Sequence, residues 1–163
     1  MPAYARMLVS AVVFGLLLSG STVLAELPTK PVLTLEAAKK LAAAAEEEAV
    51  KNKWNMVIVI VDDGGSLIYL QRLDGTQIGS IEVALHKAKT AVHFKRPTKA
   101  LEDAVTGGRM VVLALGAMPI EGGLPLIVDD KLIGAIGVSG ATAQQDGQVA
   151  KAGADALPKV LGK

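Results

Sequence analysis

The chain has 163 residues, 51% of them hydrophobic and none of them cysteine. This length fits one domain with an ample core. The lack of cysteine excludes disulfides, thiolate catalysis, Cys-ligated zinc and lipid attachment through a signal cysteine. A formal net charge of +1 and an aromatic content of 3% argue against nucleic-acid binding, which requires a basic face or stacking platforms.

The first 25 residues have the pattern of a secretory signal peptide. Arg6 precedes an apolar run from Met7 to Leu18, and small and polar residues then lead to Ala25. The run is shorter than the ~20 apolar residues that a spanning helix needs. We expect cleavage after Ala25 and a periplasmic or secreted protein. A buried N-terminal helix is the alternative.

The remaining chain is predicted to form an extended linker at 26–32 and a single domain at 33–163. Hydrophobic periodicity and turn residues give its elements in chain order. They are a helix from the cap Thr34 to about Val50, strands at 56–61 and 66–73, a helix capped by Ser80 and ended by Pro97, a short helix capped by Thr98 and running through Val105, an ambiguous segment at 110–115, a hairpin turning at 128–131, and a helix at 142–157 ended by Pro158.

The two predicted hairpins share a plan in which an apolar strand ends at Val-Asp-Asp and a turn leads into a second strand. Helices before, between and after them predict an α+β fold with a mainly antiparallel sheet of about five strands flanked by helices. Paired carboxylates at both turns could serve acid/base chemistry or calcium binding. Turn geometry explains them more simply. These residues are Asp62, Asp63, Asp129 and Asp130.

The last predicted strand is apolar on both faces. Strict alternation places Leu132, Gly134, Ile136 and Val138 on one face and the residues between them on the other. We expect helices to cover one face and a second subunit or an apolar ligand to cover the other. Self-association is therefore predicted.

His86 and His93 are the only histidines, and both fall on the helix that begins at Ser80. Seven residues separate them by about 10.5 Å along one helix face. Two nitrogens that share one metal are only roughly 4 Å apart, so one chain cannot use both on one iron or zinc. Glu82, one turn before His86, could share a metal with it or form a polar contact on a solvated face.

A basic cluster lies near the end of the same helix. Its residues could interact favourably with the helix C-terminus or clamp an anionic group such as a haem propionate. The members are Lys87, Lys89, Lys95 and Arg96.

Two long segments, HKAKTAVHFKRPTKALEDAV and PIEGGLPLIVDDKLIGAIGVSGATAQQDGQVAKAGADAL, resemble the GlcG/HbpS family of haem-degrading domains, which also forms the C-terminal part of PduO-type proteins. The resemblance runs from about Leu33 to Leu157. It implies a profilin- or PAS-like α+β fold, assembly into oligomers, and haem binding with degradation in some members. One branch is implied to act as secreted partners of a membrane sensor kinase. The glycine pair Gly122-Gly123 and the dipeptide Ser139-Gly140 belong to this pattern, and tight packing is their favoured role over ligand approach.

Our leading hypothesis is an exported haem-binding protein that degrades or sequesters haem. His86 and His93 are the candidate iron ligands, and Lys95 and Arg96 are the candidate propionate clamps. His86 is favoured because Glu82 could orient its ring. The alternative is a non-enzymatic oligomeric protein that binds a small metabolite or assists a redox sensor. If neither histidine binds iron, the remaining candidate ligands are Tyr69, Met110, Met118 and Thr90.

Overall fold

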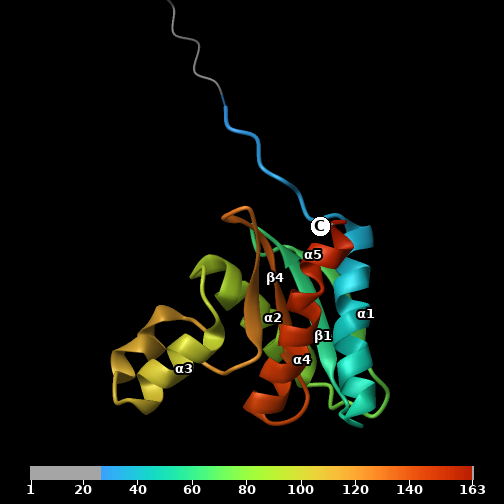
Figure 1. Cartoon of the computed structure of the whole chain (residues 1–163). Helices are drawn as coiled ribbons and strands as arrows, with labels where there is room; N and C mark the ends of the chain where they lie inside the picture. The colour runs from blue at the N-terminus through green and yellow to red at the C-terminus, as the bar shows by residue number, and fades with distance from the viewer. Residues whose placement is uncertain (1–26, 163) are drawn as a thin grey trace, which may run out of the picture.

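A computed structural model of the protein describes residues 27–162, which form a four-stranded antiparallel sheet with helices on both faces (Figure 1). The predicted signal peptide lies outside the described residues. Within the described range, no helix is long and apolar enough to cross a membrane. The elements are α1 (Leu35–Lys51), β1 (Val57–Asp62), β2 (Leu67–Arg72), α2 (Ser80–His93), α3 (Thr98–Thr106), the 3-10 helix η1 (Met110–Leu115), β3 (Gly123–Val128), β4 (Lys131–Ser139), α4 (Ala143–Asp155) and α5 (Leu157–Val160).

The sheet has the order β2-β1-β4-β3, and every neighbouring pair is antiparallel. Val57 to Val61 of β1 are fully buried, as a continuous apolar run in a central strand requires. The predicted α+β class is therefore confirmed. The sheet has four strands rather than about five, because the ambiguous segment Met110–Leu115 forms η1.

Two apolar layers enclose the sheet. The first lies beneath α1 and α4, which pack against each other, and it contains Leu41, Ile58, Ile60 and Ile136. The second lies beneath α2 and is built from Val57, Val59 and Val61 of β1 with small residues of the helix. Each face of the central strands is therefore covered within one chain.

A β-bulge changes the predicted faces of β4. Leu126 pairs with Gly134 while Ile127 pairs with Leu132, so Ile133 is an extra residue in the ladder. Ile133 packs on the α1 side together with Ile136, whereas Leu132 packs toward α2. The expectation that a second subunit or a ligand covers one face of this strand is wrong, because α2 covers it.

The acidic turns serve the geometry predicted for them. Asp129 and Asp130 have φ values of 47° and 60°, the left-handed pair that a two-residue hairpin of type I′ requires. In the other hairpin, Asp62 Oδ1 accepts hydrogen bonds from the backbone N–H groups of Gly64 at 2.9 Å and Ser66 at 2.8 Å. The side chain thereby organises the turn.

Some helix ends differ from the prediction. Thr34 caps α1 as expected and accepts a hydrogen bond from the Ala37 backbone at 3.2 Å. Ser80 and Thr98 do not cap their helices, because their hydroxyls make tertiary hydrogen bonds to Ser139 and Gly123 instead. Pro158 does not end the last helix. It stands in the first turn of α5, where its missing N–H has no cost.

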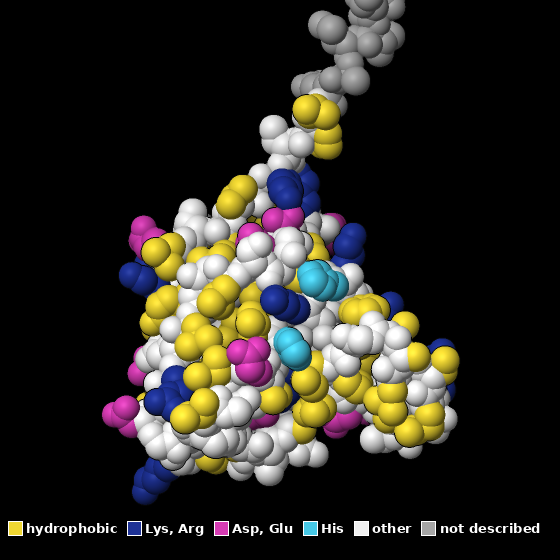
Figure 2. Space-filling view, turned by 180° about the vertical axis from the view of Figure 1, so that it is seen from behind, with side chains coloured by type: hydrophobic (Ala, Val, Ile, Leu, Met, Phe, Trp, Pro, Cys, Tyr) yellow, Lys and Arg dark blue, Asp and Glu magenta, His cyan; other side chains and the backbone are white. Residues whose placement is uncertain are grey.

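Residues 98–120, which contain α3 and η1, form an arm that projects from the sheet on the side opposite α1 (Figure 1). Apolar side chains of the arm face solvent and give the projecting lobe in Figure 2 its hydrophobic surface. The exposed large ones are Met110, Val111, Leu113, Leu115 and Ile120.

Gly137 lets α2 approach the backbone of β4. A Cβ atom at this position would lie 2.1 Å from the Ala84 carbonyl oxygen and 2.6 Å from the Ala88 nitrogen. Both are main-chain atoms of α2, so neither can move without moving the helix. The helix therefore rests on the strand without a side chain between them.

We predict that Gly137→Ala lowers the free energy of unfolding by about 1–3 kcal/mol or more through overpacking. Gly79→Ala is the matched control, since a Cβ at Gly79 meets nothing within 4 Å. Urea denaturation of both variants tests this expectation. Equal midpoints for the two variants would contradict the direct contact between α2 and β4.

Candidate functional site

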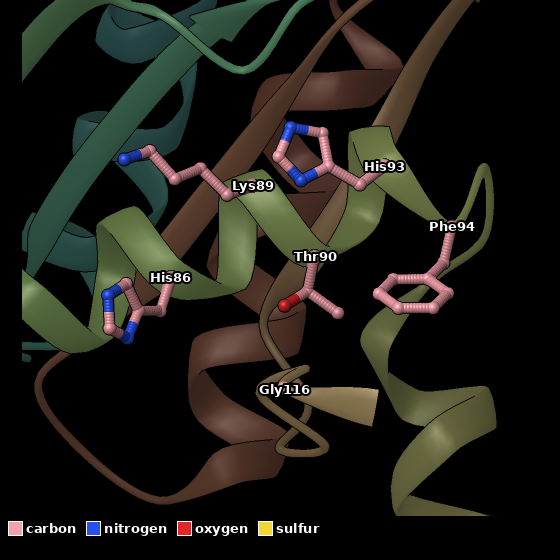
Figure 3. Close-up of a pocket in the computed structure, with 6 residues that line it drawn as sticks. All are labelled: His86, Lys89, Thr90, His93, Phe94 and Gly116. Carbon is pink, nitrogen blue, oxygen red and sulfur yellow. The ribbon is translucent and has the colours of Figure 1, made fainter. Parts of the chain in front are cut away.

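One face of α2 lines a hollow of about 240 Å³. His86, Lys89, Thr90 and His93 recur at helical spacing and therefore project from the same side of the helix (Figure 3). Phe94 at the end of the helix and Gly116 of the arm complete the lining. We call this hollow the histidine groove.

His93 is held by the first hairpin turn. Its Nε2 lies 3.2 Å from the Gly64 carbonyl oxygen. A carbonyl can only accept, so the contact requires that Nε2 carries the proton and leaves Nδ1 as the acceptor in the neutral ring. Gly65, with φ of 86°, allows this approach, because a Cβ there would lie 2.5 Å from Nε2.

His86 lies two turns before His93 and is exposed at the other end of the groove. Within residues 27–162 its ring makes no hydrogen bond to protein, and Glu82 does not contact it as a hydrogen-bond partner. Nor do the described residues contain a group of three His, Asp or Glu side chains suited to one metal ion. Figure 2 shows both histidines on one face of the molecule with a cationic side chain between them. Figure 3 identifies Lys89 in that position.

The predicted clamp residues Lys95 and Arg96 do not line the histidine groove. Lys95, together with Lys30 and Lys131, lines a second hollow of about 450 Å³ beside the hairpin turns. Arg96 donates from Nε to the Phe94 carbonyl at 3.2 Å, which stabilises the end of α2. Of the basic cluster, Lys89 alone lines the histidine groove.

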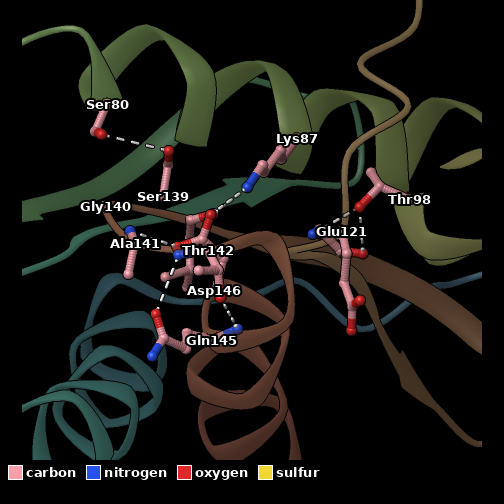
Figure 4. Close-up of polar contacts among 12 residues, drawn as sticks. Ser80, Lys87, Thr98, Glu121, Ser139, Gly140, Ala141, Thr142, Gln145 and Asp146 are labelled. Atoms are coloured by element: carbon pink, nitrogen blue, oxygen red, sulfur yellow. Dashed lines mark hydrogen bonds and ion pairs between the residues drawn. The ribbon is translucent and has the colours of Figure 1, made fainter. Parts of the chain in front are cut away.

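Lys87 points away from that cluster into the protein (Figure 4). Its Nζ lies 2.6 Å from Asp146 Oδ2 and donates to the Val138 carbonyl at 3.1 Å. The Lys87 and Asp146 side chains are only 1% and 4% exposed. Burial raises the pKa of the Asp146 carboxyl, and the Lys87 ammonium opposes that shift. The interpretation of Lys87 as part of a surface cluster is wrong, because residue 87 lies about 100° around the helix from His86.

Two glycines of the family pattern, Gly122 and Gly140, pack closely against their neighbours near this ion pair. A Cβ at Gly122 would lie 2.6 Å from the Val138 carbonyl oxygen and 2.9 Å from Lys87 Nζ. At Gly140 a Cβ would lie 2.1 Å from the Asn55 carbonyl oxygen. These contacts agree with the packing role predicted for Gly122 and Gly140.

Residues 33–155 match the family model described as "Haem degrading protein HbpS-like". The chain belongs to this HbpS-like family. Protein GlcG of Escherichia coli K12 is 42% identical over 112 residues, which cover 68% of this chain and 84% of GlcG.

Solved structures agree with this assignment. A double mutant of HbpS from Streptomyces reticuli superposes with a TM-score of 0.73 at 32% identity, covering 96% of this chain and 99% of HbpS. A complex of PduOC with haem has a TM-score of 0.70 at 32% identity, covering 77% of this chain and 95% of PduOC.

Two groove residues, Phe94 and Gly116, were not predicted from the sequence as parts of a site, whereas Thr90 was named there as a reserve ligand. Phe94 follows Thr90 by four residues and His86 by eight, so the periodicity of α2 could have identified it. Gly116 reaches the groove through the fold of the arm, and no local pattern indicates that contact. The partner of Lys87 was likewise hidden, although both Lys87 and Asp146 lie in segments that carry the family resemblance.

We predict that Lys87→Met lowers the free energy of unfolding by roughly 3–5 kcal/mol, since it leaves the buried Asp146 carboxylate without its cation. Lys151→Met is the matched control, because Lys151 pairs with Asp155 at 2.5 Å on the exposed side of α4. Chemical denaturation should show a nearly unchanged stability for the control. Similar losses in the two variants would refute the importance of the buried pair.

Proposed function

We propose that this protein is an exported haem-binding protein and that the histidine groove is its haem site. The observation that carries the proposal is the juxtaposition of His86, Lys89 and His93 on one face of α2. An imidazole can bind iron, and an ammonium group can pair with a propionate. The family assignment and the haem complex of the related PduOC support this choice of ligand.

The donor set fits haem, but the groove does not enclose it. Its volume of about 240 Å³ falls below the roughly 300–1,000 Å³ of pockets that bury a drug-sized ligand. A haem seated on α2 would therefore extend toward the arm and remain partly uncovered by this chain. The exposed apolar residues of the arm would adjoin it, and they also favour the self-association that we propose.

His86 is the better candidate for the iron ligand. The Nε2 atom of His93 is engaged by the Gly64 carbonyl. Its Nδ1 atom is adjacent to the ring carbon that bears Cβ, so a flat macrocycle bound there would collide with the side chain itself and with α2. The His86 ring has no hydrogen bond within the described chain and can present Nε2 outward.

Lys89 lies one turn beyond His86 and takes the propionate-binding role first considered for Lys95 and Arg96. His86 would hold the iron of a bound haem, and the haem would supply oxygen or peroxide chemistry. The chain contributes the ligand, the cation and the Phe94 ring beside them. This arrangement suits sequestration, and haem degradation would also require that oxygen or peroxide reach the bound haem.

The small volume of the groove favours one alternative, a non-enzymatic protein that binds a smaller anionic metabolite between Lys89 and the histidines. Haem titration distinguishes the two. A Soret band that saturates at a fixed ratio supports haem binding. Broad spectra without saturation support the metabolite.

We predict that His86→Ala abolishes or shifts the Soret band and that His93→Ala leaves it largely intact. His93 is the matched control, because it lines the same groove but its Nε2 bonds to Gly64. Absorption spectra of both variants under haem titration provide the measurement. If both keep the wild-type spectrum, neither histidine is the ligand.

A further inference from the structure

The arm is attached to the rest of the domain by hydrogen bonds at its two ends. At the first end, Thr98 Oγ1 accepts from the Gly123 backbone at 2.9 Å. At the returning end, the Met118 backbone N–H donates to Thr90 Oγ1 at 2.9 Å. Three residues later, the Glu121 backbone N–H donates to Glu102 Oε2 of α3 at 2.5 Å. The Met118 contact holds the returning segment beside the histidine groove, and the Glu121 contact ties the end of that segment to α3.

The surroundings of the Glu121 carboxyl group disfavour its charged form. Its Oε2 atom is buried and has no hydrogen-bond partner among the described residues. Its Oε1 atom fills the space beside Gly147, where a Cβ would lie 2.3 Å from it. Burial raises the pKa of the Glu121 carboxyl, and the nearby Glu102 carboxylate raises it further.

The surrounding charges do not balance Glu121. Lys99, Glu102 and Asp103 face it from α3, and Lys87 faces it from α2. Both lysines already have carboxylate partners: Lys99 pairs with Asp103, and Lys87 pairs with Asp146 of α4. Glu121 and Glu102 are also the two residues whose hydrogen bond holds the returning end of the arm to α3. Repulsion between their carboxylates therefore opposes that contact.

We propose that Glu121 is a pH-sensitive latch, so that its protonated form fastens the returning end of the arm and its ionised form loosens it. Protonation removes the repulsion from Glu102 and gives Glu121 a hydroxyl that can donate. Because Gly116 and the Met118–Thr90 contact border the groove, the latch controls ligand access there. This consequence for the ligand rests on the proposed function, whereas the latch itself does not.

The direction of the pH effect follows from the difference in the Glu121 pKa between the two states of the arm. Opening of the arm would move the Glu102 carboxylate of α3 away from Glu121, so the pKa of the Glu121 carboxyl is higher in the fastened state than in the open state. Fastening is complete below the open-state pKa and is weakened as the pH rises through the fastened-state pKa. Each unit of difference between the two values changes the opening equilibrium about tenfold.

Amide hydrogen exchange in the ligand-free full-length protein tests the latch. The amides of Glu121 and Met118 report the two contacts at the returning end of the arm. We expect wild-type protection, corrected for intrinsic exchange, to be lower at about pH 7.5 than at about pH 5. In Glu121→Gln, which is neutral and retains a donor, protection should stay near the acidic wild-type value at both pH values.

Glu47→Gln is the matched control, because Glu47 is an exposed carboxylate on α1, across the molecule from the arm. It should retain the wild-type pH dependence. A pH dependence that persists in Glu121→Gln at wild-type size belongs to other groups such as His86 and His93, and would overturn the latch. Equal wild-type protection at the two pH values would also overturn it. A failed haem titration leaves either result unaffected.

Discussion

The direct contact between α2 and the backbone of β4 determines how the rest of the protein is arranged. Gly137 removes the side chain that would otherwise separate the two elements. Small residues of α2, Ala84 and Ala88, meet it from the helix. Because both sides are close-packed, α2 has little freedom to rotate about its axis. Lys87 is thereby directed past the end of β4 to the first turns of α4, and the face that carries His86 and His93 is left toward solvent.

The buried ion pair connects α2, on one face of the sheet, with α4, on the other. Lys87 reaches both Asp146 and the Val138 carbonyl, while Asp146 also accepts from the Ala141 backbone at 3.1 Å. These bonds satisfy the groups that leave water, but desolvation offsets much of the attraction between the charges. The ion pair consequently contributes less to net stability than to the relative positions of the elements that it joins. It joins α2, the end of β4 and the start of α4 in one arrangement.

Local chemistry predicted much of the fold. The Thr34 cap, the acidic turns and the apolar run of β1 each follow from short-range rules, and together they give the α+β class. The rule of strict alternation failed in β4, because the bulge at Ile133 arises from pairing with β3. Helical spacing could also have identified the groove residues that lie on α2.

Contacts between distant segments were not accessible in the same way. Lys87 looked like its basic neighbours because charge type alone does not show which side of a packed helix a residue occupies. The hydroxyls of Ser80 and Thr98 were expected at helix ends, yet each meets a group more than twenty residues away. A polar side chain near a helix start can serve either purpose, and only the tertiary structure decides between them.

The arm connects these observations to ligand binding. The histidine groove on α2 is too shallow to enclose a large ligand by itself, so its coverage depends on the segment beside it. Gly116 supplies that neighbour, and the exposed side chains of η1 extend the apolar surface beyond it. Only Leu101 and Val112 among the large apolar residues of the described arm are buried, and segments with few buried apolar contacts open at lower free-energy cost than the sheet they adjoin. The sheet and α2 therefore set the positions of His86 and Lys89, while the arm would set how much of a ligand bound in the groove is covered.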